Sequence, residues 1–236
     1  MPRAGELTYY ERIGESGRRH ALGKPFSDDD CGLYLLRAGA LFSLLPPPPA
    51  RVLECGCGTG WLSHFLARRG YDVVGTDVST DAIRLATSHP LFRDGNVPAF
   101  AVADSESLTF ESEFDAVVFF DSLHHSIDEV AALKSAFRAL KAGGVCVALE
   151  PGRGHARKSA AVDAEFDVTD KDMPPSRVCR AARRAGFTRT RIVPAPQHLG
   201  KALYRSRWAA PVRHIVVQLI MLWQGQYCGI AILHKD

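Results

Sequence analysis

The chain has 236 residues, of which 46% are hydrophobic and 23% are charged, and its formal net charge is +3. This composition is ordinary for a globular protein with one substantial core, so we expect one main domain with additions. Because the net charge is small, it argues against bulk binding of nucleic acid. Any charged partner must be attracted by a local cluster of side chains.

The first residues, MPRAGELTYYERIG, contain no apolar run of the kind found in secretion signals. We therefore expect a cytoplasmic protein without disulfides. The 6 cysteines show no C-x-x-C spacing, so the sequence predicts neither a zinc site nor a redox motif and requires no metal.

Residues 51–150 alternate short β-branched runs with helical patterns, which is typical of a parallel sheet with crossover helices. The prolines Pro46–Pro49 cannot continue a preceding helix, and they mark a boundary. We expect a helical lid or cap over residues 1–45 and the main domain over residues 46–236. The expected strands are Ala50–Glu54, Tyr71–Thr76, Ala99–Ala103, Phe114–Phe120 and Val145–Glu150, with helices at Trp61–Arg69, Thr80–Ser88 and Asp128–Leu140.

The last third of the chain predicts a helix from Pro174 to Gly186 and then two strands, Thr188–Val193 and Tyr227–His234, as a terminal antiparallel pair. A helical insertion over residues 194–226 separates these strands. Its apolar run Pro211–Trp223 is too short to span a bilayer. Residues 205–223 either contact a membrane surface or a lipid-like acceptor, or pack under the sheet edge or in a homodimer.

The residues after the first strand, Glu54 to Gly60, contain three glycines in the spacing G-x-G-x-G. A strand that turns directly into a helix through glycines brings bare backbone N–H groups close to an anionic or polar ligand. The dinucleotide motif G-x-G-x-x-G needs a glycine where this chain has Trp61. A plain tight turn is the alternative interpretation of such a cluster.

Two carboxylates follow the next strands. Asp77 ends the second strand, where it could accept hydrogen bonds from both hydroxyls of a ribose. Asp104 and Ser105 follow the third strand, where they could reach the edge of an adenine ring. As an alternative, Asp77 or Asp104 could cap a helix.

Together these stretches resemble the successive motifs of class I methyltransferases, in the right order over about residues 50 to 150. The resemblance implies an α/β, Rossmann-like, seven-stranded and mainly parallel sheet with an antiparallel last strand and helices on both faces. It also implies that the methyl donor is S-adenosyl-L-methionine, with S-adenosyl-L-homocysteine as product. The matching stretches are Val52–Gly60, Gly75–Ser79, Ala103–Ser105, Phe114–Val118 through Leu123–His125, and Leu140–Gly144.

The same resemblance assigns the donor-binding residues. Glu54 and the loop hold the methionine end, Asp77 the ribose, and Asp104 with Ser105 the adenine. The full set of expected donor-binding residues is Glu54, Gly56, Cys57, Gly58, Gly60, Asp77, Val78, Asp104, Ser105 and Asp121.

Methyl transfer from a sulfonium needs a base only if the acceptor arrives protonated. Asp121, His124 and His125 are the candidates because they follow the fourth strand, at the edge where open α/β sheets bind ligands. We expect His124 to be the better base and His125 the more structural residue. Alternatively, both histidines pack beside the donor.

The sequence says least about which residues bind the methyl acceptor. Tyr9 and Tyr10 could belong to an aromatic lid, and the apolar run Leu33–Leu45 could cover the cleft or simply pack as a helix. Arg153 and His155 follow the fifth strand and could bind an acceptor, or lie on a solvated loop.

Three functions are compatible with these patterns. The first is transfer of a methyl group to oxygen or nitrogen of a small molecule, such as a metabolite, a sugar or a natural-product intermediate. The second, favoured only by arginine clusters, is methylation of RNA or protein. The third is a module that binds S-adenosylmethionine without catalysis. We favour the first, with no nucleic-acid partner.

Overall fold

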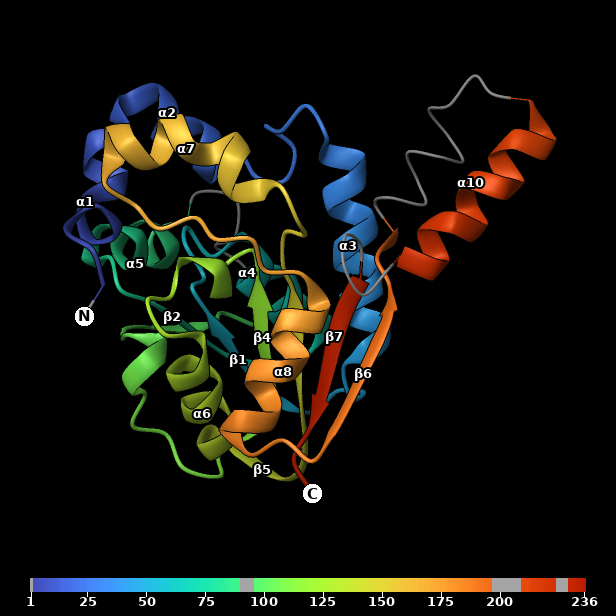
Figure 1. The fold of residues 1–236 in the computed structure, drawn as a ribbon. Helices are drawn as coiled ribbons and strands as arrows, with labels where there is room; N and C mark the ends of the chain where they lie inside the picture. The colour runs from blue at the N-terminus through green and yellow to red at the C-terminus, as the bar shows by residue number, and fades with distance from the viewer. Residues whose placement is uncertain (1, 90–95, 197–208, 224–228) are drawn as a thin grey trace.

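The computed structural model describes residues 2–89, 96–196, 209–223 and 229–236 (Figure 1). Within these residues, a seven-stranded sheet of order β3-β2-β1-β4-β5-β7-β6 lies at the centre. β7 is antiparallel to both its neighbours, and the other pairings are parallel, which confirms the predicted topology. The strands are β1 Arg51–Cys55, β2 Asp72–Asp77, β3 Ala99–Val102, β4 Phe114–Phe120, β5 Leu140–Leu149, β6 Arg189–Pro194 and β7 Gly229–His234.

Helices cover both faces of the sheet, so the central strands are buried on two sides. On one face, α3 (Cys31–Leu44) and α4 (Trp61–Arg69) form a core with one set of strand side chains. On the other face, α6 (Glu129–Ala139) and α8 (Pro175–Ala185) pack against the alternate set. This two-sided burial explains why β4 is an apolar run without polar alternation. A further helix, α5 (Thr80–Thr87), connects β2 and β3.

Two elements differ from the sequence-based expectation. β5 begins at Leu140 and continues through Gly143 and Gly144, where a loop was expected. The reason is long-range pairing, because Gly143 and Gly144 exchange backbone hydrogen bonds of 2.8 and 3.0 Å with Lys235 near the C-terminus. Helix α7 (His155–Phe166) was not predicted, because none of its residues is buried and it therefore shows no apolar periodicity.

A cap lies above the carboxyl ends of the parallel strands (Figure 1). It consists of α1 (Ala4–Arg12), α2 (Gly14–Leu22) and α7. The contact between α1 and α7 is close, because a Cβ on Gly5 would lie 2.0 Å from the carbonyl oxygen of Phe166. α3 does not cover the cleft with its apolar face, since it buries Leu41 and Ala38 against the sheet.

The chain before β7 contains α10 (Ala210–Trp223), which projects from the body of the molecule (Figure 1). None of its residues is buried. Within the described ranges, no helix combines the length and apolar character needed to cross a membrane. The expected start of the last strand at Tyr227, and residues 205–208 of the expected contact segment 205–223, lie outside the described residues.

Candidate functional site

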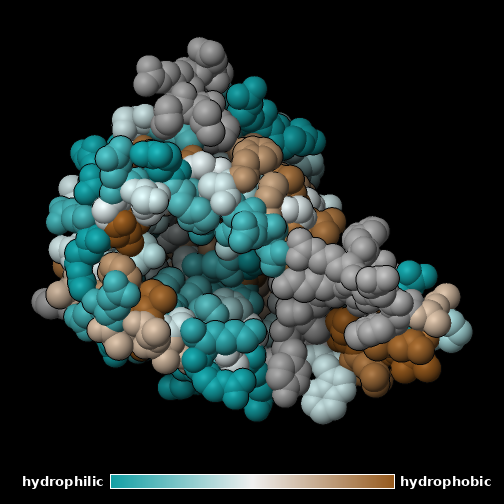
Figure 2. All heavy atoms as spheres, turned by 90° about the horizontal axis from the view of Figure 1, so that it is seen from above, coloured by the Kyte–Doolittle hydropathy of each residue, from teal (hydrophilic) through white to brown (hydrophobic). Residues whose placement is uncertain are grey.

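A cavity of about 310 Å³ opens where the parallel strands end, beneath the cap. Seen from the side of the cap, the molecule is hollowed near its middle, and hydrophilic residues surround the hollow (Figure 2). The cavity collects side chains from the loops after β1, β2, β3 and β4. The lining residues predicted from the sequence are Gly56, Gly58, Asp77, Val78, Asp104, Ser105, Asp121, His125, Tyr9 and Tyr10.

The glycine loop after β1 adopts a conformation that side chains oppose. Gly56, Gly58 and Gly60 have φ values of 70°, 53° and 78°. A Cβ on Gly56 would lie 2.5 Å from the Cβ of Ser122, and one on Gly58 would lie 2.7 Å from the Tyr10 hydroxyl. The loop therefore needs glycine both for its backbone angles and for close approach. It leads into α4, whose N-cap Gly60 makes no side-chain hydrogen bond.

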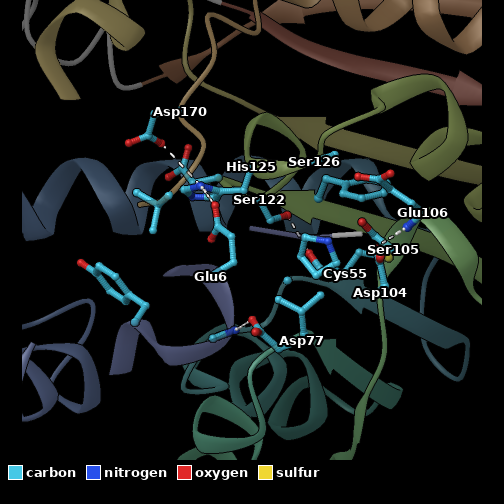
Figure 3. Close-up of a pocket in the computed structure, with 18 of the residues that line it drawn as sticks. Glu6, Cys55, Asp77, Asp104, Ser105, Glu106, Ser122, His125, Ser126 and Asp170 are labelled. Carbon is cyan, nitrogen blue, oxygen red and sulfur yellow. Dashed lines mark hydrogen bonds and ion pairs between the residues drawn. The ribbon is translucent and has the colours of Figure 1, made fainter. Parts of the chain in front are cut away.

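Asp77 lies at the end of β2 with its carboxylate at the cavity (Figure 3). It accepts hydrogen bonds from the backbone N–H groups of Gly58 and Ser79, each 2.9 Å long. Burial raises the pKa of Asp77, although these two N–H groups oppose the shift. The carboxylate thus holds the glycine loop, and its remaining acceptor positions lie at the cavity.

Asp104 and Ser105 line the same cavity at the end of β3 (Figure 3). Asp104 also accepts a 2.9 Å hydrogen bond from the N–H of Glu106 and caps the short 3₁₀ helix η1 (Ser105–Ser107). Asp104 thus both caps η1 and lines the cavity. The glycine loop, Asp77 and Asp104 therefore border one cavity.

Glu54 does not line this cavity. It is buried at the end of β1, where the hydroxyl of Ser63 donates a hydrogen bond to it. Burial raises the pKa of Glu54 to about 8, so the side chain is largely protonated at neutral pH. Gly60 is also absent from the cavity lining, whereas Glu54 and Cys57 border a second cavity of about 480 Å³.

The second cavity is aromatic and shares Tyr9, Tyr10, Gly56, Gly58 and Asp121 with the first. Aromatic side chains from the cap, α3, α4 and β4 surround it. The sequence gives no sign that these residues meet, because they come from four separate segments. The aromatic residues that line it are Tyr9, Tyr10, Tyr34, Trp61 and Phe120.

Asp121 was a candidate base, and its surroundings argue against that role. Both of its oxygens accept hydrogen bonds from the guanidinium of Arg37, at 2.5 Å each. Burial alone would raise the pKa of Asp121, but the charge of Arg37 outweighs burial and lowers that pKa. An occupied carboxylate of low pKa is a poor proton acceptor. Arg37 itself was missed, because nothing in the sequence around α3 connects it to β4.

His124 was expected to be the better base, and the geometry favours the opposite assignment. Its side chain is only 4% exposed and lies between two carboxylates, with Nδ1 2.7 Å from Glu150 and Nε2 3.1 Å from Asp170. Burial alone would lower the pKa of His124, but these hydrogen bonds raise it to about 10. Both ring nitrogens are therefore protonated and engaged at neutral pH.

His125 is the histidine that reaches the cavity (Figure 3). Its Nδ1 lies 2.8 Å from the carbonyl oxygen of Thr169, and a carbonyl can only accept, so Nδ1 carries the hydrogen. Glu6 and Asp170 lie on either side of this nitrogen, each 3.5 Å away. Neither acid was predicted from the sequence, because they come from α1 and from the segment after α7.

Of the two predicted acceptor residues after β5, neither lines the first cavity. His155 begins α7 and points its Nε2 toward Asp170, at 3.4 Å. Arg153 is exposed in the preceding loop. Glu150, which directly follows β5, accepts hydrogen bonds from the N–H groups of Ser122, Leu123 and His124 and so holds the loop after β4 in place.

Comparison with known proteins agrees with this geometry. Residues 53–148 match the family model described as a methyltransferase domain. A ubiquinone biosynthesis O-methyltransferase of Psychrobacter arcticus is 32% identical over 160 residues, which cover 61% of this chain and 61% of the relative. The chain thus matches about three fifths of that relative's length.

Two solved structures share the fold. The complex of the Haloferax volcanii Trm112 methyltransferase activator with a putative methyltransferase gives a TM-score of 0.67 at 16% identity, covering 100% of this chain and 99% of the other. The Haemonchus contortus phosphoethanolamine N-methyltransferase 2 complex with S-adenosyl-L-methionine gives a TM-score of 0.67 at 17% identity, covering 99% of this chain and 60% of the other. Residues 53–148 of this chain thus match a methyltransferase domain, and its fold is that of the two solved structures.

Proposed function

We propose that this chain binds S-adenosyl-L-methionine and transfers its methyl group to an oxygen or nitrogen atom of a small molecule, releasing S-adenosyl-L-homocysteine. The observation that carries the proposal is one cavity that brings together Gly56 and Gly58, Asp77, and Asp104 with Ser105. These residues would hold the methionine end, the ribose and the adenine in that order.

The protein's contribution to such a reaction is mainly positional. When bound, S-adenosylmethionine supplies a methyl group that its sulfonium charge has already activated. The glycine loop and Asp77 would fix the donor, and the cap would exclude water from the reacting centre. Alignment of the acceptor atom with the methyl group can then supply much of the rate enhancement.

The acceptor side of the cavity lies between α1 and the segment that follows α7. Glu6, His125 and Asp170 meet there (Figure 3). Because two of these three side chains are acidic, the site disfavours a nucleic-acid backbone and supports a small-molecule acceptor. The names of the relatives, an O-methyltransferase and a phosphoethanolamine N-methyltransferase, agree with that class.

We also propose that residues 1–45 supply most of the cap through α1 and α2, while α3 packs on the sheet, and that residues 194–226 are an insertion with a separate role. Two observations support the cap. Arg12 donates 2.5 Å hydrogen bonds to the carbonyls of Glu165 and Phe166, and Glu6 accepts a 2.7 Å hydrogen bond from Thr169. The exposed apolar surface of α10 supports a peripheral contact for the insertion, either with a membrane surface or with a second copy.

Substitution of Asp77 tests the donor site. Asp77→Ala removes the ribose-binding carboxylate, and charged hydrogen bonds of this kind contribute about 1.5–3 kcal/mol each, so we expect affinity for S-adenosylmethionine to fall roughly a hundredfold. Isothermal titration calorimetry measures the affinity. Asp72→Ala, at the exposed start of the same strand, is the matched control and should bind normally.

The proposal fails if the unchanged protein binds neither S-adenosylmethionine nor S-adenosylhomocysteine. It also fails in its site assignment if Asp77→Ala and Asp72→Ala bind the donor equally well.

A further inference from the structure

Three imidazole rings converge on one carboxylate beside the cavity. The distances to Oδ1 of Asp170 are 3.1 Å from Nε2 of His124, 3.4 Å from Nε2 of His155 and 3.5 Å from Nδ1 of His125. We propose that these four residues form a binding site for a first-row divalent transition-metal ion. Within the described residues, candidate ligand atoms of His124, His125 and Asp170 all lie within 4.8 Å of one another.

The spacing of these atoms suits a small ion. Four ligands about 2.1 Å from a tetrahedral metal are about 3.4 Å from one another, and the three nitrogens lie at nearly that separation from Oδ1 of Asp170. His155 is outside the group of three residues whose ligand atoms all lie within 4.8 Å, so its ring would move toward the ion on binding. Imidazole nitrogens with one carboxylate favour Zn²⁺ and its neighbours over Mg²⁺, which prefers oxygen ligands and bound water.

The surroundings of His124 are those of a metal-binding histidine. Its Nδ1 is 2.7 Å from Glu150, whose carboxylate is fixed by three backbone N–H groups. A carboxylate on the far nitrogen holds the ring in one orientation and directs Nε2 toward Asp170. Because both ring nitrogens carry hydrogen in the metal-free protein, the ion would bind Nε2 by displacing its proton. This arrangement of carboxylate, histidine and ligand position recurs around protein-bound zinc.

A second observation, independent of that geometry, concerns His155. Its Nε2 is buried and has no hydrogen-bond partner among the described residues, although it points at Asp170 from 3.4 Å. A buried polar nitrogen without a partner is costly, and a metal ion would satisfy it. His125 would exchange its hydrogen bond to Thr169 for coordination through the same nitrogen.

The site faces the proposed acceptor position, because His125 and Asp170 also line the 310 Å³ cavity. This step rests on the proposed function. An acceptor hydroxyl bound to the ion as a fifth ligand would lose its proton to solvent more easily. Its oxygen would then form a bond to the methyl carbon as the carbon–sulfur bond breaks and its electron pair returns to sulfur. The acceptor class is therefore a small molecule with a metal-binding hydroxyl group.

Metal titration tests the site without measuring activity. The full-length protein is stripped with a chelator, and Zn²⁺ is titrated in competition with an indicator of known affinity. We expect one Zn²⁺ per chain and much weaker binding of Mg²⁺. Asp170→Asn and His155→Gln should each weaken Zn²⁺ binding at least about tenfold. His214→Gln removes an exposed histidine on α10 and is the control, with unchanged affinity.

Substitution of Co²⁺ gives a second readout, because its visible absorption reports the number and kind of ligands. Asp170→Asn should change that spectrum. Circular dichroism checks that each variant is folded, and His155→Gln keeps the test decisive if Asp170→Asn is unstable, since the His155 side chain is 31% exposed.

The inference is overturned if Zn²⁺ does not bind, if Mg²⁺ binds better, or if His214→Gln weakens binding as much as the cluster variants do. The cluster is then an ion-pair network around Asp170. Binding of S-adenosylmethionine to the metal-free protein separates the two proposals. Donor binding without Zn²⁺ binding leaves the proposed function standing, and Zn²⁺ binding without donor binding leaves only the metal site.

Discussion

Glu54 shows how a single buried residue sets a pH dependence. The pKa of its carboxyl is raised from 4.5 to about 8, first of all by burial. Between those values the unfolded chain releases the proton while the folded chain retains it. The stability that Glu54 provides in its protonated form is therefore lost as the pH rises from about 4.5 to about 8, by about 1.4 kcal/mol per pH unit.

Glu54→Gln tests this dependence, because glutamine keeps an acceptor for Ser63 but cannot ionise. We expect its free energy of unfolding, relative to that of the unchanged protein, to rise by at least about 2 kcal/mol between pH 5.5 and pH 8. Urea unfolding of both proteins without donor measures the difference. A difference that stays constant with pH would show that Glu54 is ionised in the folded state.

Neighbouring residues can differ entirely in role. His124 and His125 are adjacent in the sequence, yet one side chain is 4% exposed and the other 37%. The 3₁₀ helix η2 (Leu123–His125) turns the first ring inward toward Glu150 and the second toward the cavity. No local pattern distinguishes two consecutive histidines, so the sequence could not show which of the two reaches the cavity.

At the scale of elements, the ion pair between Arg37 and Asp121 connects α3 to the end of β4. Asp121 has a φ of 51°, which is unusual for a residue other than glycine, and both of its oxygens accept from Arg37. The guanidinium also stacks over Phe120, 4.4 Å from the ring centre. This pair fixes the loop that carries the histidines.

Arg37→Met leaves the partly buried Asp121 carboxylate, whose side chain is 29% exposed, without its partner. Loss of one member of a fully buried pair typically costs about 3–5 kcal/mol, so for this partly exposed pair we expect a loss of about 2 kcal/mol in the free energy of unfolding. Arg19→Met breaks an exposed pair with Glu15 in α2 and should cost less than about 1 kcal/mol. Chemical denaturation compares the two, and equal losses would contradict the buried pair's importance.

At the scale of the whole molecule, α10 lies outside the hydrophobic core. The two core clusters lie on the two faces of the sheet, and neither includes a residue of α10. Ile215, Leu219 and Leu222 are 58%, 49% and 78% exposed. Brown apolar side chains of α10 form an arm beside the body of the molecule (Figure 2). Stability of the fold should therefore be independent of this surface.

The combined change Ile215→Gln, Leu219→Gln and Leu222→Gln tests that independence. We expect the free energy of unfolding to change by less than about 1 kcal/mol and the affinity for S-adenosylmethionine to be unchanged. Leu41→Gln, at a fully buried position of α3, should cost about 3 kcal/mol or more. A large loss from the α10 changes would mean that α10 packs against the body in solution.

The sequence by itself determined the sheet, its antiparallel last strand and the glycine loop, because each depends on short-range patterns. Glycines at fixed spacing after β1, and acids placed directly after β2 and β3, reach one edge of any parallel sheet. Tertiary structure decided the acceptor side. Arg37, Glu6 and Asp170 come from segments remote from β4, and only folding brings them against Asp121, His124 and His125. Burial between those segments, which no local pattern records, sets the charge and the partner of each group.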